Sequence, residues 1–194
     1  YVSYKIPELP KPVKAISIPA FNLQPFTSIW QNLPEPIYTP QPKPMEDFDQ
    51  NQGLMLYRTK LIGHKSGRLK IWEPHDYALV FLNGQFIDTV YRDGGKWEVT
   101  RPKTDVKEPV LDILVEGMGH INFAQFMIDR KGITDRVTLN GMTLMNWETY
   151  KLPLDEQFIT TIRSNAQAAI PNNNGKFFKG IFSLSETGDT YFDM

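Results

Sequence analysis

Short apolar runs separated by turn-forming residues fill the chain from about residue 53 to residue 154. Such runs predict β-strands, because successive side chains of a strand point to opposite faces of a sheet. No long helical pattern interrupts them, so we expect an all-β fold, an antiparallel sandwich or jelly roll. The expected strands are residues 54–61, 69–72, 78–82, 85–91, 97–100, 110–116, 137–139, 142–144 and 147–154.

Turn-forming residues separate these runs at definite positions. Two Asn-Gly pairs each lie between two expected strands, and both residue types tolerate the positive φ angles of a tight hairpin turn. A third group follows the expected strand 110–116, where glycines permit a tight corner and an asparagine can cap a turn. The predicted structural turn residues are Asn83, Gly84, Gly117, Gly119, Asn122, Asn140 and Gly141.

The first 44 residues have a different texture. They hold ten of the 15 prolines and no glycine, so residues 1–44 are predicted to be an extended, Pro-rich arm or linker, partly polyproline II. Ile16, Ile18 and Ala20 alternate, and Phe26 and Ile29 begin a run at near-helical spacing. A free linker would not need these side chains, so we expect the arm to lie on a folded surface.

The last part of the chain predicts a helix followed by further strands. Residues 155–170 place Phe158, Ile159 and Ile162 on one helical side, residues 172–175 break the helix, and residues 176–184 and 190–193 are strand-like. We therefore expect residues 156–194 to be a connection and the first strands of a second β-module, cut short, after a β-domain at residues 45–155. Segments 16–23 and 177–184 are expected to pair, and an apolar face left open there would allow a homodimer.

Composition removes several function classes. With 21 basic and 22 acidic residues the formal charge is -1, which argues against a nucleic-acid-binding protein. No apolar run is long enough to span a membrane. The absence of cysteine excludes disulfides and thiolate chemistry, and only three histidines, His64, His75 and His120, are present. We expect no metal site and no cofactor.

Acidic side chains could supply a glycosidase pair, but their setting favours a structural role. Asp112 and Glu116 share one face of an expected strand, and a carboxylate pair on a half-exposed strand is usually solvated. Residues 129–131 carry mixed charges that suit ion pairs within a turn. We therefore predict no catalytic residue in this chain.

Aromatic residues beside loops are the other candidate chemistry, because sugar-binding sites pair exposed rings with polar groups. The speculative sugar-binding residues are Trp72, His75, Trp97 and Trp147. The alternative is that the tryptophans lie in the core and that His75 forms a solvated pair with the adjacent aspartate.

Four ordered strings carry a family resemblance: LYRT at residues 56–59, DYALVFLNGQ at 76–85, LDILVEGMGHINF at 111–123 and DRKGI at 129–133. In this order they resemble the accessory region of glycoside hydrolase family 35 β-galactosidases. Residues 17–21 resemble the stretch that joins the catalytic barrel of that family to its accessory domains. Residues 177–182 and 188–193 look like the opening of its next β-domain. Gly117 and His120 depart from the pattern, where the family usually has asparagine and arginine.

The resemblance implies a galactose-binding-domain-like jelly roll and a parent enzyme that hydrolyses terminal β-galactosides. It also implies that the catalytic barrel lies upstream, and no glutamate here matches that barrel's catalytic motifs. We therefore expect a non-catalytic accessory domain that packs against the barrel and against a downstream β-domain, in a periplasmic or secreted enzyme. Two alternatives stay open: a carbohydrate-binding module for galactosides or other glycans, and a protein-interaction sandwich without sugar affinity. For a galactoside we expect weak binding at most.

Overall fold

The computed structural model describes residues 7–63, 66–93, 95, 97–123, 125, 127–164 and 175–191. His64, residues 172–174 of the predicted helix break and residues 192–193 of the strand-like segment at 190–193 lie outside the described residues. The chain divides into two units, one formed by Phe26–Phe177 and the other by Tyr1–Pro25 with Phe178–Met194.

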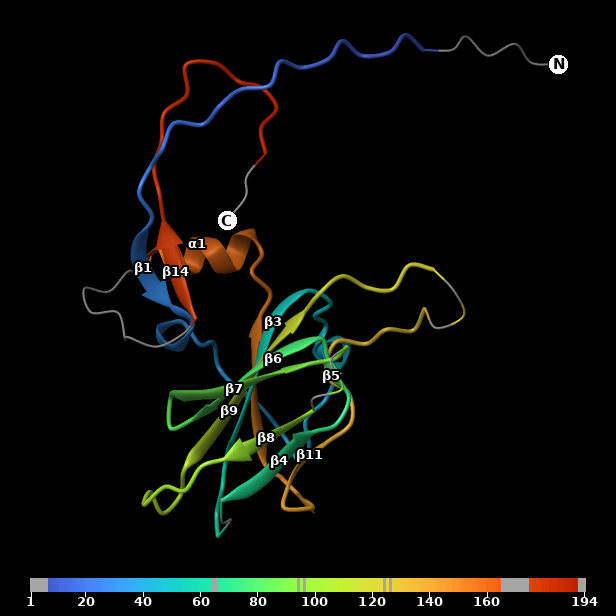
Figure 1. The fold of residues 1–194 in the computed structure, drawn as a ribbon, viewed down its shortest axis with the longest axis vertical. Helices are drawn as coiled ribbons and strands as arrows, with labels where there is room; N and C mark the ends of the chain where they lie inside the picture. Colours follow the sequence, from blue (N-terminus) through green and yellow to red (C-terminus); the bar gives the residue numbers. More distant parts are fainter. Residues whose placement is uncertain are drawn as a thin grey trace, which may run out of the picture. The chain divides into compact units, whose positions relative to one another are not determined.

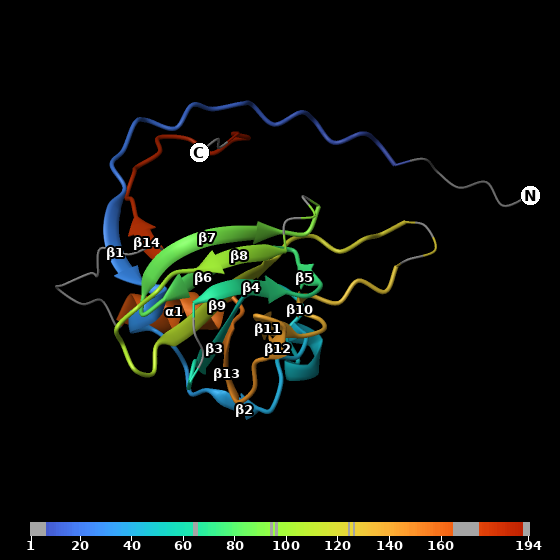
Figure 2. The same cartoon turned by 60° about the horizontal axis from the view of Figure 1, so that its bottom comes forward.

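The larger unit is built on two antiparallel sheets, and the predicted all-β sandwich is confirmed (Figures 1 and 2). The six-stranded sheet has the order β2 (Ile37–Thr39), β13 (Trp147–Leu152), β3 (Gly53–Lys60), β9 (Val110–Gly117), β6 (Tyr77–Leu82) and β7 (Gln85–Tyr91). The four-stranded sheet has the order β12 (Met142–Thr143), β11 (Val137–Leu139), β4 (Gly67–Ile71) and β8 (Glu98–Arg101). A short pair joins β5 (Pro74–His75) to β10 (Gly132–Ile133).

Alternation along the strands explains the main core. In β3, Met55 and Tyr57 are fully buried, and they belong to one apolar cluster with Leu69 and Ile71 of β4 and Val137 of β11. Residues one position away on β3 face the other side of the sheet, as the period of two requires. The inner faces of the two sheets therefore form the main core of the sandwich.

A second apolar cluster covers part of the outer face of the six-stranded sheet. There Leu56, Phe81 and Leu114 pack with Ile29 of the short 3-10 helix η1 (Ile29–Gln31). Phe158 of helix α1 (Glu156–Ser164) packs against the same cluster. The remainder of this outer face carries polar side chains and forms the groove described below.

Short regular elements form in and beside the arm that was expected to be a linker. The residues from Ile37 to Thr39, predicted as linker, form β2 at the edge of the six-stranded sheet. The near-helical spacing from Phe26 does not give an α-helix, because β1 (Gln24–Ser28) is a strand and only η1 follows it. A further 3-10 helix, η2 (Met45–Phe48), begins beside Pro44.

The two terminal segments do pair, but not at the predicted residues. The ladder joins β1 to β14 (Lys176–Lys179), so the predicted strand over residues 16–23 is wrong in position. Within the smaller unit, Ala15 and Asp189 form an isolated parallel bridge, and the rings of Phe21 and Phe182 lie 5.0 Å apart.

The two Asn-Gly pairs have the backbone that a tight hairpin requires. The φ angles are 51° at Asn83 and 75° at Gly84, and 52° at Asn140 and 83° at Gly141. Each pair directly joins two paired strands, β6 to β7 and β11 to β12.

Gly117, the last residue of β9, and Gly119 do not have the positive φ angles expected of a tight corner. A Cβ atom on Gly117 would lie 3.2 Å from the Cβ of Lys131, whereas Gly119 has open space at that point. Close packing against Lys131 therefore explains the small residue at position 117. Asn122 is exposed in the loop that follows.

Candidate functional site

The loop between β9 and β10 is held at its base by a buried ammonium group. Lys131 is fully buried, and its Nζ donates hydrogen bonds to Asp76 Oδ2 at 2.6 Å, Asp129 Oδ2 at 2.9 Å and the carbonyl oxygen of Gly119 at 3.1 Å. An ammonium group has three N–H donors, so these three acceptors satisfy it completely.

A second cation completes this charge cluster. Arg92 Nη1 donates to Asp76 Oδ1 at 2.9 Å and to Asp129 Oδ1 at 2.7 Å, so each carboxylate receives hydrogen bonds from both cations. Burial alone would raise the pKa of Asp129, but the hydrogen bonds from Lys131 and Arg92 outweigh it and lower that pKa well below its usual range. The buried cluster of Asp76, Arg92, Asp129 and Lys131 thus pairs two carboxylates with two cations.

The expected ion pair within residues 129–131 is present between Asp129 and Lys131, but it is buried and belongs to a larger cluster. Lys131 also bonds Asp76, which lies 55 residues away along the chain. Arg130 instead forms surface ion pairs with Glu46 and Asp47.

Backbone groups fasten the first half of the same loop. The two ring nitrogens of His120 lie 2.8 Å from the carbonyl oxygen of Asp129 and 2.9 Å from that of Asn51. The amide of Ile121 donates to Asp129 Oδ2 at 3.1 Å. The loop is therefore attached to the sandwich at both of its ends.

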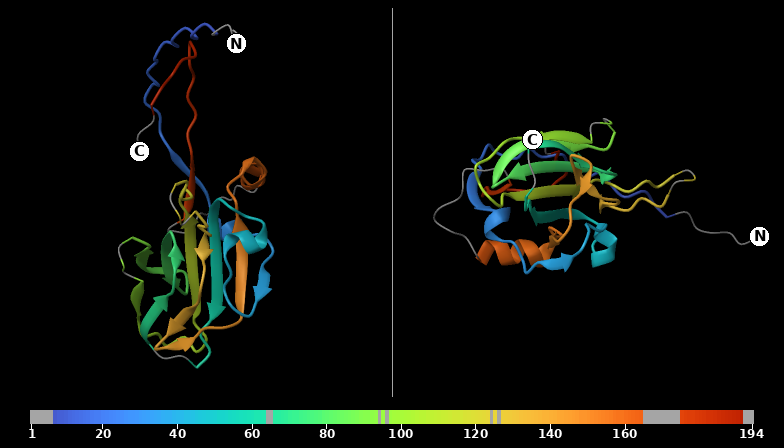
Figure 3. Two further views of the ribbon diagram at one scale, coloured as in Figure 1. Left: turned by 90° about the vertical axis from the view of Figure 1, so that its right-hand side faces the viewer. Right: turned by 90° about the horizontal axis from the view of Figure 1, so that it is seen from below.

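Beyond this base, the backbone of the loop extends away from the sheets (yellow in Figures 1 and 3). Several of its apolar side chains are exposed. Phe123 is 83% exposed and Ile128 is 92% exposed. Isolated exposed apolar residues are ordinary, whereas several close together are typical of interaction surfaces. We call this surface the apolar loop; its exposed residues are Met118, Ile121, Phe123, Met127 and Ile128.

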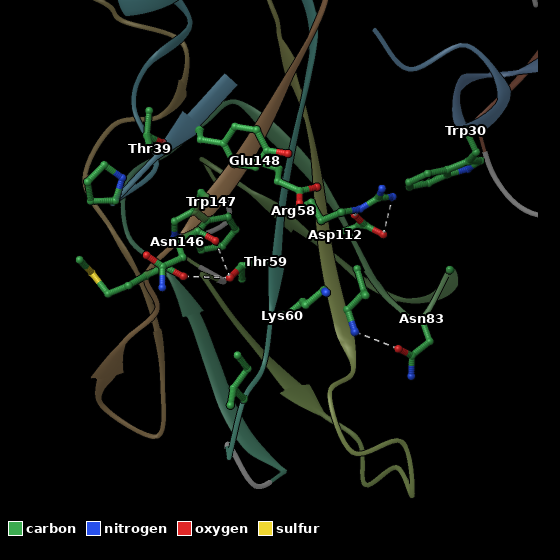
Figure 4. A pocket seen from close by; sticks show the side chains of 16 residues that line it. Trp30, Thr39, Arg58, Thr59, Lys60, Asn83, Asp112, Asn146, Trp147 and Glu148 are labelled. Carbon is green, nitrogen blue, oxygen red and sulfur yellow. Dashed lines mark hydrogen bonds and ion pairs between the residues drawn. The ribbon is translucent and has the colours of Figure 1, made fainter. Parts of the chain in front are cut away.

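A groove of about 940 Å³ lies on the outer face of the six-stranded sheet (Figure 4). Its centre is Arg58 of β3, whose Nε donates to Asp112 Oδ1 of β9 at 2.6 Å. Arg58 is also the cross-strand neighbour of Glu148 of β13, and Glu148 is the neighbour of Tyr38 of β2. Register therefore places Tyr38, Glu148, Arg58 and Asp112 in one row across four strands.

The carboxylates of the groove are held in different ways. Burial raises the pKa of Asp112, while the hydrogen bond from Arg58 opposes that effect. The Tyr150 hydroxyl donates to Glu148 Oε2 at 2.6 Å, and burial together with this bond raises the pKa of Tyr150 to about 12. The expectation of a solvated face is wrong for Asp112, which is 2% exposed, while Glu116 on the same strand is exposed.

The four speculative sugar-binding residues have separate partners. Trp72 is stacked by two cations, with Lys70 Nζ at 3.6 Å and Arg136 Cζ at 4.5 Å from its ring centroid. The indole of Trp97 packs against the main core and donates to the carbonyl oxygen of Arg92 at 3.3 Å.

The other two predicted residues also have structural contacts. Trp147 is fully buried, donates to the carbonyl oxygen of Leu144 at 3.0 Å and contributes to the wall of the groove. His75 Nδ1 lies 2.6 Å from the carbonyl oxygen of Arg130, and the adjacent Asp76 is buried. The described contacts do not bring the four residues together in one site.

Sequence reasoning missed the residues at the centres of both sites. Arg58 and Glu148 are cross-strand neighbours although 90 positions separate them, and nothing near either residue signals the other. One feature of the sequence could have indicated the groove. Arg58 and Lys60 are two positions apart in an expected strand, so both basic side chains lie on the same face of the sheet.

Two further functions find no support in the described part of the chain. Within the ranges given above, no group of three or more histidine or acidic side chains could hold a metal ion. No helix among those residues is both long enough and apolar enough to cross a membrane.

Comparison with known proteins places this architecture in a family. Residues 42–153 match the family model described as the first all-beta domain of beta-galactosidase. Beta-galactosidase of Xanthomonas manihotis is 33% identical over 193 residues, which cover 97% of this chain and 31% of that protein. Beta-galactosidase 1 of Dictyostelium discoideum is 28% identical over 214 residues, which cover 97% of this chain and 32% of that protein. Beta-galactosidase-1-like protein 3 of Mus musculus is 29% identical over 202 residues, which cover 97% of this chain and 30% of that protein.

The chain thus spans about a third of the length of the relatives it matches. The family match covers more than half of the chain, in the region that folds as the sandwich. We conclude that the chain belongs to the β-galactosidase family and contains that family's first all-β domain.

Proposed function

We propose that this chain is a non-catalytic accessory domain of a β-galactosidase and that its apolar loop packs against the catalytic part of that enzyme. The parent would hydrolyse terminal β-galactosides in a barrel upstream of this domain, with a further β-domain downstream. The length of the relatives supports this proposal, since about two thirds of each has no counterpart in this chain.

The observation that carries the proposal is the contrast between the two ends of the apolar loop. Its base is fixed by the buried charge cluster and by His120, whereas Phe123 and Ile128 are exposed. A cluster of this kind is a costly way to hold a loop that has no partner, because burying Asp76, Asp129 and Lys131 removes three charges from water and consumes much of their attraction to one another. Such a base is well suited to presenting apolar side chains to another domain in a fixed orientation.

The same contacts support the absence of catalysis. A glycosidase needs two carboxylates that face the substrate from opposite sides. Asp76 and Asp129 are instead buried and bonded to Lys131 and Arg92, and Asp112 is bonded to Arg58. Each is engaged as a structural acceptor, which leaves no matched acid and base among them.

The test uses the parent enzyme with Phe123→Ser and Ile128→Ser combined. We expect the enzyme to lose thermal stability and galactosidase activity, while this chain alone melts at an unchanged temperature, because the altered side chains are exposed in it. Val106→Ser is the matched control, since Val106 is exposed on a different loop. The docking role would be contradicted if the parent enzyme with both changes had the same thermal stability and activity as the parent enzyme with Val106→Ser.

A further inference from the structure

The groove on the outer face of the six-stranded sheet is a second site, distinct from the apolar loop. The loop leaves β9 at Gly117, whereas the groove is lined by Val110 and Asp112 at the other end of that strand. At the usual rise per residue, the two ends of β9 are about 23 Å apart. A molecule in the groove would therefore leave the apolar loop free to dock.

The size and composition of the groove suit a small polar ligand. Its volume of about 940 Å³ lies within the usual range of ligand sites. The ionisable groups in its lining are Arg58, Lys60, Asp112 and Glu148, so positive and negative charges balance. This balance gives no net attraction for a phosphate or another strongly charged molecule, and it favours a neutral one.

Aromatic side chains stand on both sides of the charged row. Tyr38 lies at the β2 end and is 73% exposed. Trp30 lies at the other end, where its ring contacts Phe81 edge-on at 5.0 Å between centroids. Figure 4 shows Arg58 between Glu148 and Asp112, with Trp30 beyond Asp112. The contact with Phe81 fixes the orientation of the indole.

The polar groups between these rings are also preorganised. Asp112 orients the guanidinium of Arg58, which stays partly exposed, and Tyr150 orients the carboxylate of Glu148. Carboxylate and guanidinium groups can accept from and donate to the hydroxyls of one ligand, and an aromatic ring can cover an apolar C–H face. A pyranose ring offers both kinds of surface.

From these contacts we infer that the groove binds a neutral saccharide, with its hydroxyls on Arg58 and Glu148 and its apolar face against Tyr38 or Trp30. The choice of a galactoside as the first probe rests on the proposed function. The location of the site does not, because it follows from the groove's own side chains. A groove this open is expected to bind with a dissociation constant on the order of 1 mM.

The test is a titration of the isotope-labelled chain with lactose, cellobiose and galacturonate, followed by amide NMR shifts. We expect lactose to shift amides of β3, β13 and β9 around Arg58, Glu148 and Asp112, and galacturonate to bind much more weakly. Tyr38→Ala and Glu148→Gln should each weaken lactose binding about tenfold, one lost contact being enough for that factor. Tyr191→Ala and Glu98→Gln, which alter residues outside the groove, should leave it unchanged.

The outcomes separate the site from the proposed function. Cellobiose binding in the groove without lactose binding would support the saccharide site and overturn the galactoside choice. Absence of groove shifts with lactose and cellobiose at about 10 mM, or shifts confined to the apolar loop, would overturn the inference. The spectrum of each variant without ligand checks its fold, and Tyr38→Ala removes an exposed ring that is not part of either core cluster.

Discussion

Lys131 is the residue on which the apolar loop depends most. Its ammonium group is fully buried, and every donor it has is used by Asp76, Asp129 or Gly119. Removing one partner from such a cluster leaves charges buried without compensation, which is far more damaging than losing a surface ion pair.

Lys131→Met therefore tests the buried charge cluster. The variant keeps an unbranched side chain of nearly the same length but removes one of the two cations that bond the buried carboxylates, so the free energy of unfolding should fall by about 3–5 kcal/mol. Urea denaturation measures this change, with Lys103→Met as the exposed control. Equal stability of the two variants would show that the cluster does not hold the fold.

The pH dependence of stability provides a second test at this scale. The pKa of Asp129 is lower in the folded chain than the usual value of about 3.9, so its contribution is fully present above about pH 4 and is lost as the pH falls toward the folded value. Asp129→Asn should melt at a lower temperature than the original chain at pH 7, and this difference should shrink steadily between pH 4 and pH 2. A difference that stays constant over that range would contradict the assignment.

These residue roles were not predictable from the sequence, for a physical reason. Asp129 and Lys131 are two positions apart and suggest a local pair, but their other partners, Asp76 and Arg92, become neighbours only when β6 pairs with β7 and β9. The buried position of Asp112 was equally hard to predict, because an acidic residue on a strand is ordinarily solvated. It is buried here because Arg58, far away in the sequence, bonds its carboxylate.

At the scale of elements, alternating apolar residues and turn residues predicted the bounds of several strands well. β7 and β11 have the predicted bounds, and β3, β6 and β9 differ by one residue at their ends. Alternation and Asn-Gly turns act within a few residues, which is why they are legible in a single sequence.

The arm was less predictable because its strands are short and flanked by proline. Pro36 and Pro40 bracket β2, which lies at the edge of its sheet, where proline is tolerated because fewer backbone donors are needed. The pattern of prolines therefore suggested a linker for a segment that is an edge strand. Pairing with β13, over 100 residues away, decides its conformation.

The turn between β6 and β7 gives a test at this scale. Gly84 has φ of 75° and open space where a Cβ would lie, so Gly84→Val should cost about 1–3 kcal/mol through backbone strain alone. Gly119→Ala is the matched control, because Gly119 also has open space but no positive φ. The melting temperature of Gly84→Val should be lower than that of Gly119→Ala. Equal melting temperatures would mean that a side chain at position 84 does not strain this hairpin.

At the scale of the whole molecule, our proposal is that catalysis takes place in another part of the parent enzyme and not in this chain. We expect the chain to show no hydrolysis of a chromogenic β-galactoside, because its buried carboxylates are bonded to cations. Release of the chromophore that disappears on Glu116→Gln or Glu148→Gln would show instead that this domain carries an acid or base of its own.

Amide hydrogen exchange can show whether the rest of the parent enzyme covers the apolar loop, as we propose. Exchange of the loop amides is measured in this chain alone and in the parent enzyme, with the amides of β3 as an internal reference. We expect the described loop residues, 118–123, 125, 127 and 128, to exchange many times more slowly in the parent, while the amides of β3 exchange at the same rate in both. Equal exchange of the loop in the two proteins would contradict the docking of this domain through Phe123 and Ile128.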